Sequence, residues 1–399
     1  MNNVHIGLVG AGIGGLAAAL SLQRIGVRVS VFERAPEIRE VGAGVIVAGP
    51  SMRGLDFLGV GDRIRDKAGK RPPGYFHMKH YASGATIQEA RDVPGQELAY
   101  ALHRADLHGV LLEAVLAHDP DCLHLGCEFA AFSQDADAVT VTFTNGNSAT
   151  VDGLVGCDGV ASVVRPATFG PEPVVYTGMV SYRGLIPAAE VTERVASENG
   201  SFYVGPEQMF LFYFVRGTEF MNVVAHARQP GWEEEGWSIS ADRSTLLGLY
   251  KDYCSVVHEV IEAIPEENLF KWALRDRPTL DQWTLGRVSL LGDAAHPLLP
   301  FLGQGGNMAI EDGTVLGRCF AAAADVAEAL ARYEATRKNR ANTVQIVSRQ
   351  KAEVLMAFAD KDAIPFRDTG GPPSYDPATV PIATKEETVT SSTIEESRC

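Results

Sequence analysis

The chain has few cysteines for its 399 residues, and their spacing excludes the common structural uses of thiols. None of the six cysteines forms a Cys-x-x-Cys pair, and no histidine cluster stands at the spacing of a zinc site. We therefore expect neither a metal site nor a disulfide framework. Free thiols of this kind are typical of proteins in the reducing cytoplasm, where we expect the protein to work.

Basic residues and long apolar runs are also scarce. Lysine and arginine together number 35 against 50 aspartates and glutamates, which gives a formal net charge of -15. Because nucleic-acid binding needs clustered basic residues, we expect no nucleic-acid partner. No run approaches the roughly 18 apolar residues of a membrane span, and the N-terminus lacks the basic and apolar regions of a signal peptide. We expect no membrane partner.

The residues that are present can form a large core, because 46% of them are hydrophobic. The length suggests about two to three domain-sized units. Residues 4–9 form a short apolar run typical of a buried parallel strand, residues 14–25 have apolar residues at helical spacing, and residues 27–33 alternate as a second strand. This order predicts a βαβ unit at the start of the chain.

Later segments predict a second sheet and then a return to the first domain. From residue 175 to residue 228 the content of β-branched and aromatic residues rises, which favours a separate antiparallel sheet. Residues 288–292 return to the buried-strand pattern, and helical patterns follow. Residues 367–399 are rich in Pro, Thr, Ser and Glu, which predicts a flexible tail.

The first motif that carries chemistry is GAGIGG at residues 10–15, which matches G-x-G-x-x-G. Gly10 permits a tight turn, Gly12 lets the backbone approach a pyrophosphate, and Gly15 lets the helix pack on the strand. Glu33 ends the second strand, where a carboxylate can accept hydrogen bonds from ribose hydroxyls. The loop predicts a dinucleotide site; the alternative is a glycine turn that serves packing alone. It does not distinguish FAD from NAD.

Two further motifs lie far along the chain. Residues 157–165 read CDGVASVVR, and residues 287–297 read as a buried strand that ends in Gly-Asp and continues into PFLGQGGN at 300–307. Asp293, at the end of that strand, can accept a hydrogen bond from a ribityl hydroxyl; the alternative is a helix N-cap. The glycines after it let backbone lie against a flat ring, since no Cβ stands in the way. Asp312 shares a helical face with apolar residues, which predicts a buried acid with a partner.

These three motifs, in this order, resemble those of the single-component FAD-dependent aromatic hydroxylases, the family of p-hydroxybenzoate hydroxylase. The resemblance covers about residues 4–350, and within the family the chain is most similar to salicylate hydroxylase and 6-hydroxynicotinate 3-monooxygenase.

The resemblance implies an α/β fold with a discontinuous, Rossmann-like FAD-binding domain of the glutathione-reductase type. The expected boundaries are 1–72, 98–174 and 275–330 for this domain, 73–97 and 175–274 for an interposed, mostly antiparallel β-sheet domain that binds substrate, 331–366 for a C-terminal helical segment, and 367–399 for the tail.

The resemblance also implies which residues contact the FAD. Asn307 would touch the isoalloxazine ring, and Asp158 and Arg165 would lie near the pyrophosphate and the NAD(P)H groove. The alternative for Asp158 and Arg165 is a turn with a surface salt bridge, and for Arg104 an ordinary arginine at a helix start. The expected FAD-binding residues are Gly10, Gly12, Ile13, Gly14, Gly15, Glu33, Arg34, Gly44, Val45, Arg104, Asp158, Arg165, Gly292, Asp293, Pro300, Gly303, Gly305, Gly306 and Asn307.

The chemistry implied by the resemblance starts with reduction of FAD by NADH or NADPH. O2 then gives a flavin C4a-hydroperoxide, which adds one oxygen to a small aromatic or N-heteroaromatic acid, with or without loss of a ring substituent. The expected partner is thus a small aromatic substrate, and a homodimer is the family expectation. The alternatives are another flavin enzyme on the same frame, such as an epoxidase or dehydrogenase, and a non-catalytic flavin-binding redox sensor.

The candidate catalytic residues are Tyr213, His296 and Pro300, and the candidate substrate-binding residues are Arg183, Ile46, Phe212, Phe301 and His226. Arg183 would hold a substrate carboxylate or a structural acid. Tyr213 would contact a phenol or belong to the core, His226 would contact substrate or be an ordinary strand residue, and the His296 ring would face either flavin or substrate. Certain pyridine-ring hydroxylases of the family carry a histidine at the position of Ile46, so that base is missing here.

Overall fold

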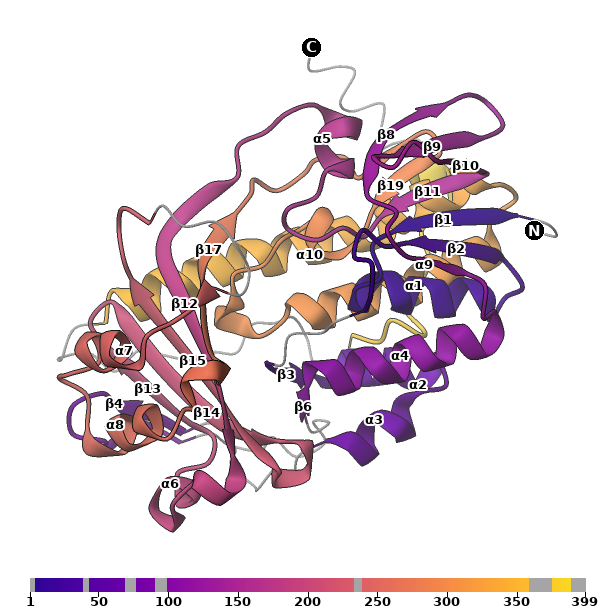
Figure 1. Cartoon of the computed structure of the whole chain (residues 1–399). Coiled ribbons are helices and arrows are strands. Elements are labelled where there is room, and N and C mark those ends of the chain that lie inside the picture. The colour runs from indigo at the N-terminus through magenta and orange to yellow at the C-terminus, as the bar shows by residue number, and fades with distance from the viewer. Residues whose placement is uncertain are drawn as a thin grey trace.

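The computed structural model describes residues 4–38, 43–68, 77–89, 99–232, 239–358 and 375–388. These residues form two sheet-based layers, a six-stranded sheet with helices packed on it and an eight-stranded sheet, which face each other across a central region (Figure 1).

The six-stranded sheet has the strand order β18-β19-β11-β1-β2-β7. Its pairs are parallel except for β18 with β19. The apolar run at β1 is buried almost throughout, as expected for a parallel strand covered on both faces. The strands are β1 (His5–Val9), β2 (Arg28–Phe32), β7 (Leu123–His124), β11 (Gly153–Gly156), β18 (Thr284–Leu285) and β19 (Val288–Leu290).

Helix α1 (Ile13–Gln23) lies on this sheet between α4 (Arg104–His118) and α9 (Gly305–Ala322). Two glycines of α9 explain how closely it approaches α1. A Cβ at Gly313 would lie 2.6 Å from the Ala18 nitrogen, and one at Gly317 would lie 2.2 Å from Ser21 Oγ. In Figure 1 a small three-stranded sheet lies on the opposite side of β1 and β2. Its strands are β8 (Phe129–Gln134), β9 (Val139–Phe143) and β10 (Ser148–Val151).

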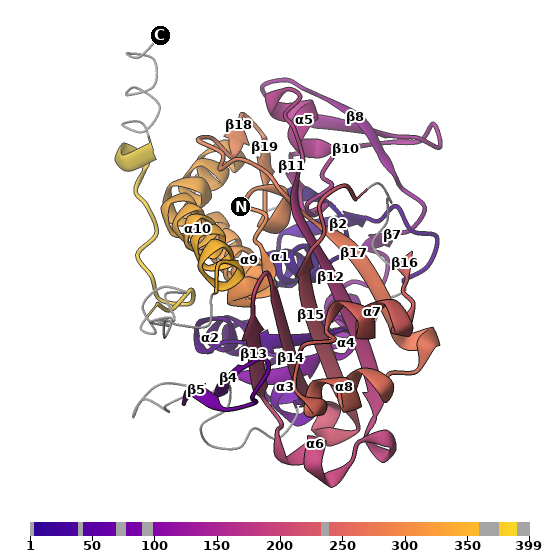
Figure 2. The same cartoon turned by 90° about the vertical axis from the view of Figure 1, so that its left-hand side faces the viewer.

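The eight-stranded sheet has the order β16-β17-β12-β15-β14-β13-β4-β5, and only β13 and β4 pair in parallel. One face packs against short helices and encloses its own apolar cluster, while the other faces the first layer (Figures 1 and 2). Its strands are β4 (His77–His80), β5 (Thr86–Gln88), β12 (Val175–Pro187), β13 (Ser201–Gly205), β14 (Gln208–Val215), β15 (Phe220–Arg228), β16 (Ile239–Ser240) and β17 (Leu269–Asp276).

A two-stranded ribbon and a long helix connect the layers. Strands β3 (Gly44–Val47) and β6 (Tyr100–His103) pair between them, and α10 (Val326–Met356) contacts both α9 and β14. The remaining helices are α2 (Gly49–Phe57), α3 (Gly61–Lys67), α5 (Val164–Phe169), α6 (Glu193–Ser197), α7 (Arg243–Leu249), α8 (Ser255–Glu262), and the 3-10 turns η1 (Ala188–Glu190), η2 (Arg216–Thr218), η3 (Glu266–Asn268), η4 (Gly292–Ala294) and η5 (Pro300–Leu302).

The expected fold class is confirmed, and so are the βαβ start and the buried strand near residue 288. The long C-terminal helix starts earlier than expected, because Asp325 caps it by accepting a hydrogen bond from the Glu328 amide at 2.9 Å. Residues 375–388 belong to the segment expected to form the tail, and they pack on the first layer through Val380, Ile382 and hydrogen bonds to α9 and α10. Within the described ranges no helix is both long and apolar enough to cross a membrane.

Candidate functional site

The glycine loop between β1 and α1 has the geometry that a dinucleotide requires. Gly10 has a φ of 106°, and a Cβ there would lie 2.7 Å from the Cys157 carbonyl oxygen. A Cβ at Gly15 would lie 2.1 Å from the Gly10 oxygen, so both positions demand glycine. A Cβ at Gly12 would meet nothing within 4 Å. The open side of Gly12, beside the first turn of α1, is where a pyrophosphate can approach the free amides.

Glu33 is fixed beside this loop. Its two carboxylate oxygens accept hydrogen bonds from the amides of Ala11 and Ala35, each at 2.9 Å. Each oxygen retains a further lone pair, so the carboxylate can still accept bonds from ribose hydroxyls. Arg34, the next residue, is exposed.

The first turn of α9 meets the same region. A Cβ at Gly306 would lie 3.8 Å from Val45 Cγ2 and 3.9 Å from Ile13 Cδ1, so the dinucleotide loop, β3 and α9 converge at this glycine. Gly14 also supports the approach, since a Cβ there would lie 3.1 Å from Ala309 Cβ. The amides of the first turn of α9 have no acceptor within the helix, and they bring its positive end to this point.

The Asn307 side chain holds β3 against α9. Its Oδ1 accepts a hydrogen bond from the Ala48 amide at 2.8 Å, and its Nδ2 donates to the carbonyls of Ile46 at 2.8 Å and Gly303 at 2.9 Å. The polar atoms of the side-chain amide are thus bonded to backbone. The expected contact of Asn307 with the flavin ring stays a prediction.

Asp293 has an acceptor oxygen without a partner near the first turn of α9. Its Oδ1 is buried and has no hydrogen-bond partner, and a Cβ at Gly305 would lie 3.7 Å from it. Burial raises the pKa of this carboxyl, while the charges of His296 and Arg104 oppose the rise. A buried acceptor without a donor is costly, so this atom fits the hydroxyl of a bound ribityl chain.

Asp158 and Arg165 stabilise the backbone around this region. Asp158 Oδ2 accepts hydrogen bonds from the amides of Val163 and Val164, and so caps α5, while its Oδ1 is buried without a partner. Arg165 is fully buried and donates to the carbonyls of Ala295 and Pro278, each at 2.9 Å. It also pairs with Glu172. Its expected pyrophosphate contact is therefore corrected to a structural tie between α5 and the segment after Asp293.

His296 also lies away from the expected place. Its ring is fully buried, with its centroid 5.0 Å from that of Trp283, and its Nε2 lies 2.6 Å from Asp312 Oδ2. The structure does not bring His296 together with Tyr213, and we correct its role to that of a buried partner of Asp312. The expectation that Asp312 is a buried acid with a partner is confirmed.

The inner face of the eight-stranded sheet carries a polar group opposite β3. Three polar side chains point from this sheet toward the first layer: Arg183 on β12, Tyr213 on β14 and His226 on β15. A Cβ at Gly44 would lie 2.7 Å from the Tyr213 hydroxyl oxygen. The His226 ring centroid lies 5.1 Å from that of Phe301 on η5, next to Pro300. Phe301 and Ile46 belong to the apolar cluster on this face.

Phe212 was expected to bind substrate, and this is wrong. Successive side chains of a strand point to opposite faces, so Phe212 and Tyr213 cannot share one. The Phe212 ring packs in the outer cluster, with its centroid 6.1 Å from that of Tyr203 and 6.3 Å from that of Phe210.

Burial controls the charge of the inner group. Burial lowers the pKa of Arg183 to about 10, opposed by Tyr213, and the guanidinium stays charged at neutral pH. Burial raises the pKa of Tyr213 to about 12, which keeps its hydroxyl protonated. Burial and then the charge of Arg183 hold the pKa of His226 well below 6.5, so the imidazole is neutral. Arg183 Nε and His226 Nδ1 are buried without hydrogen-bond partners.

Two residues of this face were missed by sequence reasoning. Asn222 lies opposite Tyr213 in the β14–β15 register, and its Oδ1 accepts the Gly44 amide at 2.6 Å. Trp272 lies beneath Arg183, with the guanidinium carbon 5.6 Å from the indole ring. Alternation from Tyr213 and His226 could have indicated Asn222, but the partner strand of Trp272 could not be read from the sequence.

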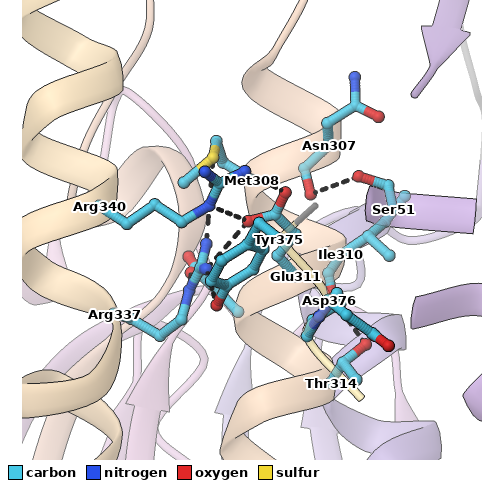
Figure 3. A network of polar contacts seen from close by, with 12 residues as sticks. Ser51, Asn307, Met308, Ile310, Glu311, Thr314, Arg337, Arg340, Tyr375 and Asp376 are labelled. Carbon is cyan, nitrogen blue, oxygen red and sulfur yellow. Dashed lines mark hydrogen bonds and ion pairs between the residues drawn. The ribbon is translucent and has the colours of Figure 1, made fainter. Parts of the chain in front are cut away.

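Tyr375 forms one polar network with Glu311 on α9 and with Arg337 and Arg340 on α10 (Figure 3). Asp312 joins this network through Arg337. Asp312 accepts hydrogen bonds from Arg337 Nε at 2.6 Å and from the Gly292 amide at 3.1 Å. Arg337 also pairs with Glu311 at 2.9 Å and donates to the Tyr375 hydroxyl. The network therefore joins the C-terminal segment to the backbone that carries Asp293.

The Tyr375 side chain should stabilise the first layer measurably. Its ring lies 3.9 Å from the Arg340 guanidinium carbon, and Arg53 donates to its carbonyl. We expect Tyr375→Ala to lower the free energy of unfolding by about 2 kcal/mol and Tyr375→Phe by about 1 kcal/mol, since the phenylalanine keeps the cation–π contact. Thermal and denaturant unfolding of the apoprotein measure this. An alanine variant as stable as the parent would show that the docked segment contributes nothing.

Comparisons with known proteins agree with this geometry. A family model described as "FAD binding domain" matches residues 3–348. The chain is 34% identical to 3-hydroxybenzoate 6-hydroxylase of Klebsiella oxytoca over 360 residues, which covers 88% of both chains. It is 31% identical to 6-hydroxynicotinate 3-monooxygenase of Pseudomonas fluorescens, covering 86% of this chain and 90% of that one. The solved structure of Klebsiella pneumoniae HpxO with FAD and uric acid matches with 28% identity and a TM-score of 0.78, covering 90% of both chains.

The chain therefore belongs to the FAD-binding domain family and, within it, to the FAD-dependent hydroxylases. The residues present fit that cofactor, since an open loop, a glycine-lined helix end and an orphaned buried acceptor converge at one place.

Proposed function

We propose that the protein adds one oxygen atom from O2 to a small hydroxylated aromatic acid of the hydroxybenzoate type, with NADH or NADPH as electron donor. The observation that carries the substrate class is Arg183. Its guanidinium is desolvated, its Nε has no partner, and no carboxylate of the described residues pairs with it. A partly buried guanidinium, with a buried Nε and no acid from the fold, is suited to an anionic ligand, here the carboxylate of the substrate.

The neighbouring residues have complementary tasks in this proposal. Bound FAD supplies the electrons and the activated oxygen. Tyr213, protonated at neutral pH, donates a hydrogen bond to the ring oxygen of the substrate, and neutral His226 can accept a hydrogen bond from a hydroxyl nearby. Ile46, Pro300 and Phe301 would form apolar walls that keep water from the reacting carbon.

The choice of ring rests on Ile46. One relative acts by its name on a hydroxybenzoate and another on a hydroxynicotinate. Because Ile46 offers no base at the position where certain pyridine-ring hydroxylases carry a histidine, we favour a benzene ring. A cytoplasmic location and a homodimer stay predictions.

The test is a ligand panel with the purified, FAD-loaded protein. It contains salicylate, 3-hydroxybenzoate, 4-hydroxybenzoate, 6-hydroxynicotinate and unsubstituted benzoate. We expect at least one hydroxybenzoate to stimulate NAD(P)H oxidation and to gain one oxygen by mass spectrometry. Stimulation that gives only hydrogen peroxide with every acid would contradict the proposal.

Tyr213→Phe should separate substrate orientation from cofactor binding. Removing one hydroxyl that meets the substrate oxygen should lower kcat/KM by about 10- to 100-fold, with FAD content unchanged. Tyr203→Phe is the matched control, because Tyr203 lies in the outer cluster, and its kcat/KM should stay within about 2-fold. Equal kinetics for the two variants would remove Tyr213 from the reaction.

A further inference from the structure

Asn222 is a fully buried amide at the point where the substrate-facing sheet touches β3. It shows 0% exposure and pairs with Tyr213 across the β14–β15 ladder. Its Oδ1 accepts the Gly44 amide at 2.6 Å. Because a backbone N–H can only donate, this bond fixes which end of the amide is oxygen and which is nitrogen.

The other end of this amide has no partner. Asn222 Nδ2 is buried and unbonded, whereas the buried amide of Asn307 satisfies both of its ends with backbone. A residue that served only to hold Gly44 would not require a second buried donor, which costs free energy when it stays unbonded. The orphaned donor therefore indicates a ligand.

The position of the unbonded donor is known relative to Gly44 and Tyr213. A Cβ built at Gly44 would lie 2.7 Å from Asn222 Nδ2 and equally 2.7 Å from the Tyr213 hydroxyl oxygen, so β3 packs tightly against both side chains. Because both polar atoms lie within 2.7 Å of one point, they are close enough together for a single ligand oxygen to hydrogen-bond to each.

We propose that Asn222 determines specificity by donating a hydrogen bond from Nδ2 to the ring oxygen substituent that Tyr213 also contacts. This inference rests on the proposed function. It assigns Asn222 two tasks, since Oδ1 positions β3 and Nδ2 selects substrates that carry an oxygen at that ring position. Arg183 recognises the carboxylate, and Asn222 with Tyr213 recognises the hydroxyl.

The experiment compares two ligands that differ by one hydroxyl, 3-hydroxybenzoate and benzoate. Their dissociation constants are measured on FAD-loaded protein by the change in flavin absorbance on titration. The ratio of the two constants reports recognition of the hydroxyl, because any effect common to both ligands cancels. We expect the parent protein to prefer 3-hydroxybenzoate by about 10-fold or more.

In Asn222→Leu, which keeps the volume and removes both polar ends, this preference should fall to about 3-fold or less. Asn222→Ala should give the same result and serves where the leucine variant does not retain FAD. Val224→Ala, two residues on and on the same face, should weaken both ligands alike and keep the ratio.

An unchanged ratio in both Asn222 variants would overturn the inference while leaving the proposed function intact. A parent protein that binds neither ligand, nor any hydroxy acid of the panel, would instead overturn the proposed function and this inference with it.

Discussion

Replacing Asp293 by alanine is expected to raise the dissociation constant for FAD by about 100-fold, so that the protein purifies largely without flavin. Asp293 Oδ1 is the buried acceptor that meets no donor in the fold, and a charge-assisted hydrogen bond to a ribityl hydroxyl would satisfy it. Flavin absorbance per polypeptide and titration of the apoprotein with FAD measure the effect.

Asp293→Asn is the matched variant. It should weaken FAD binding without lowering the stability of the apoprotein. Burial raises the pKa of Asp293 in the folded apoprotein. For an acid with a raised folded pKa, the unfolded chain releases its proton first, so stability falls as pH rises from about 4 through the folded value. The asparagine variant lacks this loss and should be as stable as the parent apoprotein, or more so, near pH 7, while it binds FAD more weakly.

The assignment needs both weaker FAD binding and an undiminished stability of the apoprotein in Asp293→Asn. An asparagine variant that loses FAD and is also destabilised as apoprotein would indicate that Asp293 is a structural acid only. A fully yellow Asp293→Ala protein would remove Asp293 from the FAD site.

Arg337→Met is expected to lower the free energy of unfolding by about 3–5 kcal/mol, because it leaves Asp312 and Glu311 buried beside each other without their shared cation. Arg337 is fully buried, and its Nε and Nη1 lie 2.6 Å and 2.9 Å from the two carboxylates. Denaturant unfolding measures the change. Arg194→Met, which breaks the largely exposed pair with Glu259, should cost about 1 kcal/mol or less.

The same network predicts acid sensitivity. Burial alone would raise the pKa of Asp312, but His296 and Arg337 lower it to about 2. Since the unfolded carboxyl has its usual pKa of 3.8, the stabilisation is complete above about pH 4 and is lost as pH falls toward 2. In Arg337→Met this part of the acid transition should shift to higher pH. An acid transition identical to that of the parent would contradict the assigned role of Arg337.

The turns of the candidate FAD site could be read from the sequence because they are local. Gly10 and Gly303 have positive φ angles, a Cβ at Gly15 would meet the Gly10 oxygen, and Asp293 follows its own strand closely. Roles that depend on distant partners were not readable. His296 is buried against Trp283 and Asp312. The Arg165 guanidinium donates hydrogen bonds to the carbonyls of Ala295 and Pro278.

The inner face of the eight-stranded sheet was predicted only in part, for a geometric reason. Sequence reasoning chose Tyr213, Arg183 and His226 by their residue type, and the structure places them on one face. Placing Phe212 required knowing which way the side chains of β14 point, which alternation alone leaves two-fold ambiguous. The docked segment at 375–388 was missed because its composition is polar. Its attachment comes from arginines on α2, α9 and α10 that meet its carbonyls and Tyr375.

The most direct measurement of the central claim is isotope transfer in a single turnover. FAD-loaded protein, reduced with NADH in the absence of air and carrying a bound hydroxybenzoate, is mixed with O2 labelled with oxygen-18. The account predicts a ring product that carries one labelled oxygen atom. An unaltered acid with all of the label in hydrogen peroxide, for every acid that binds, would contradict it.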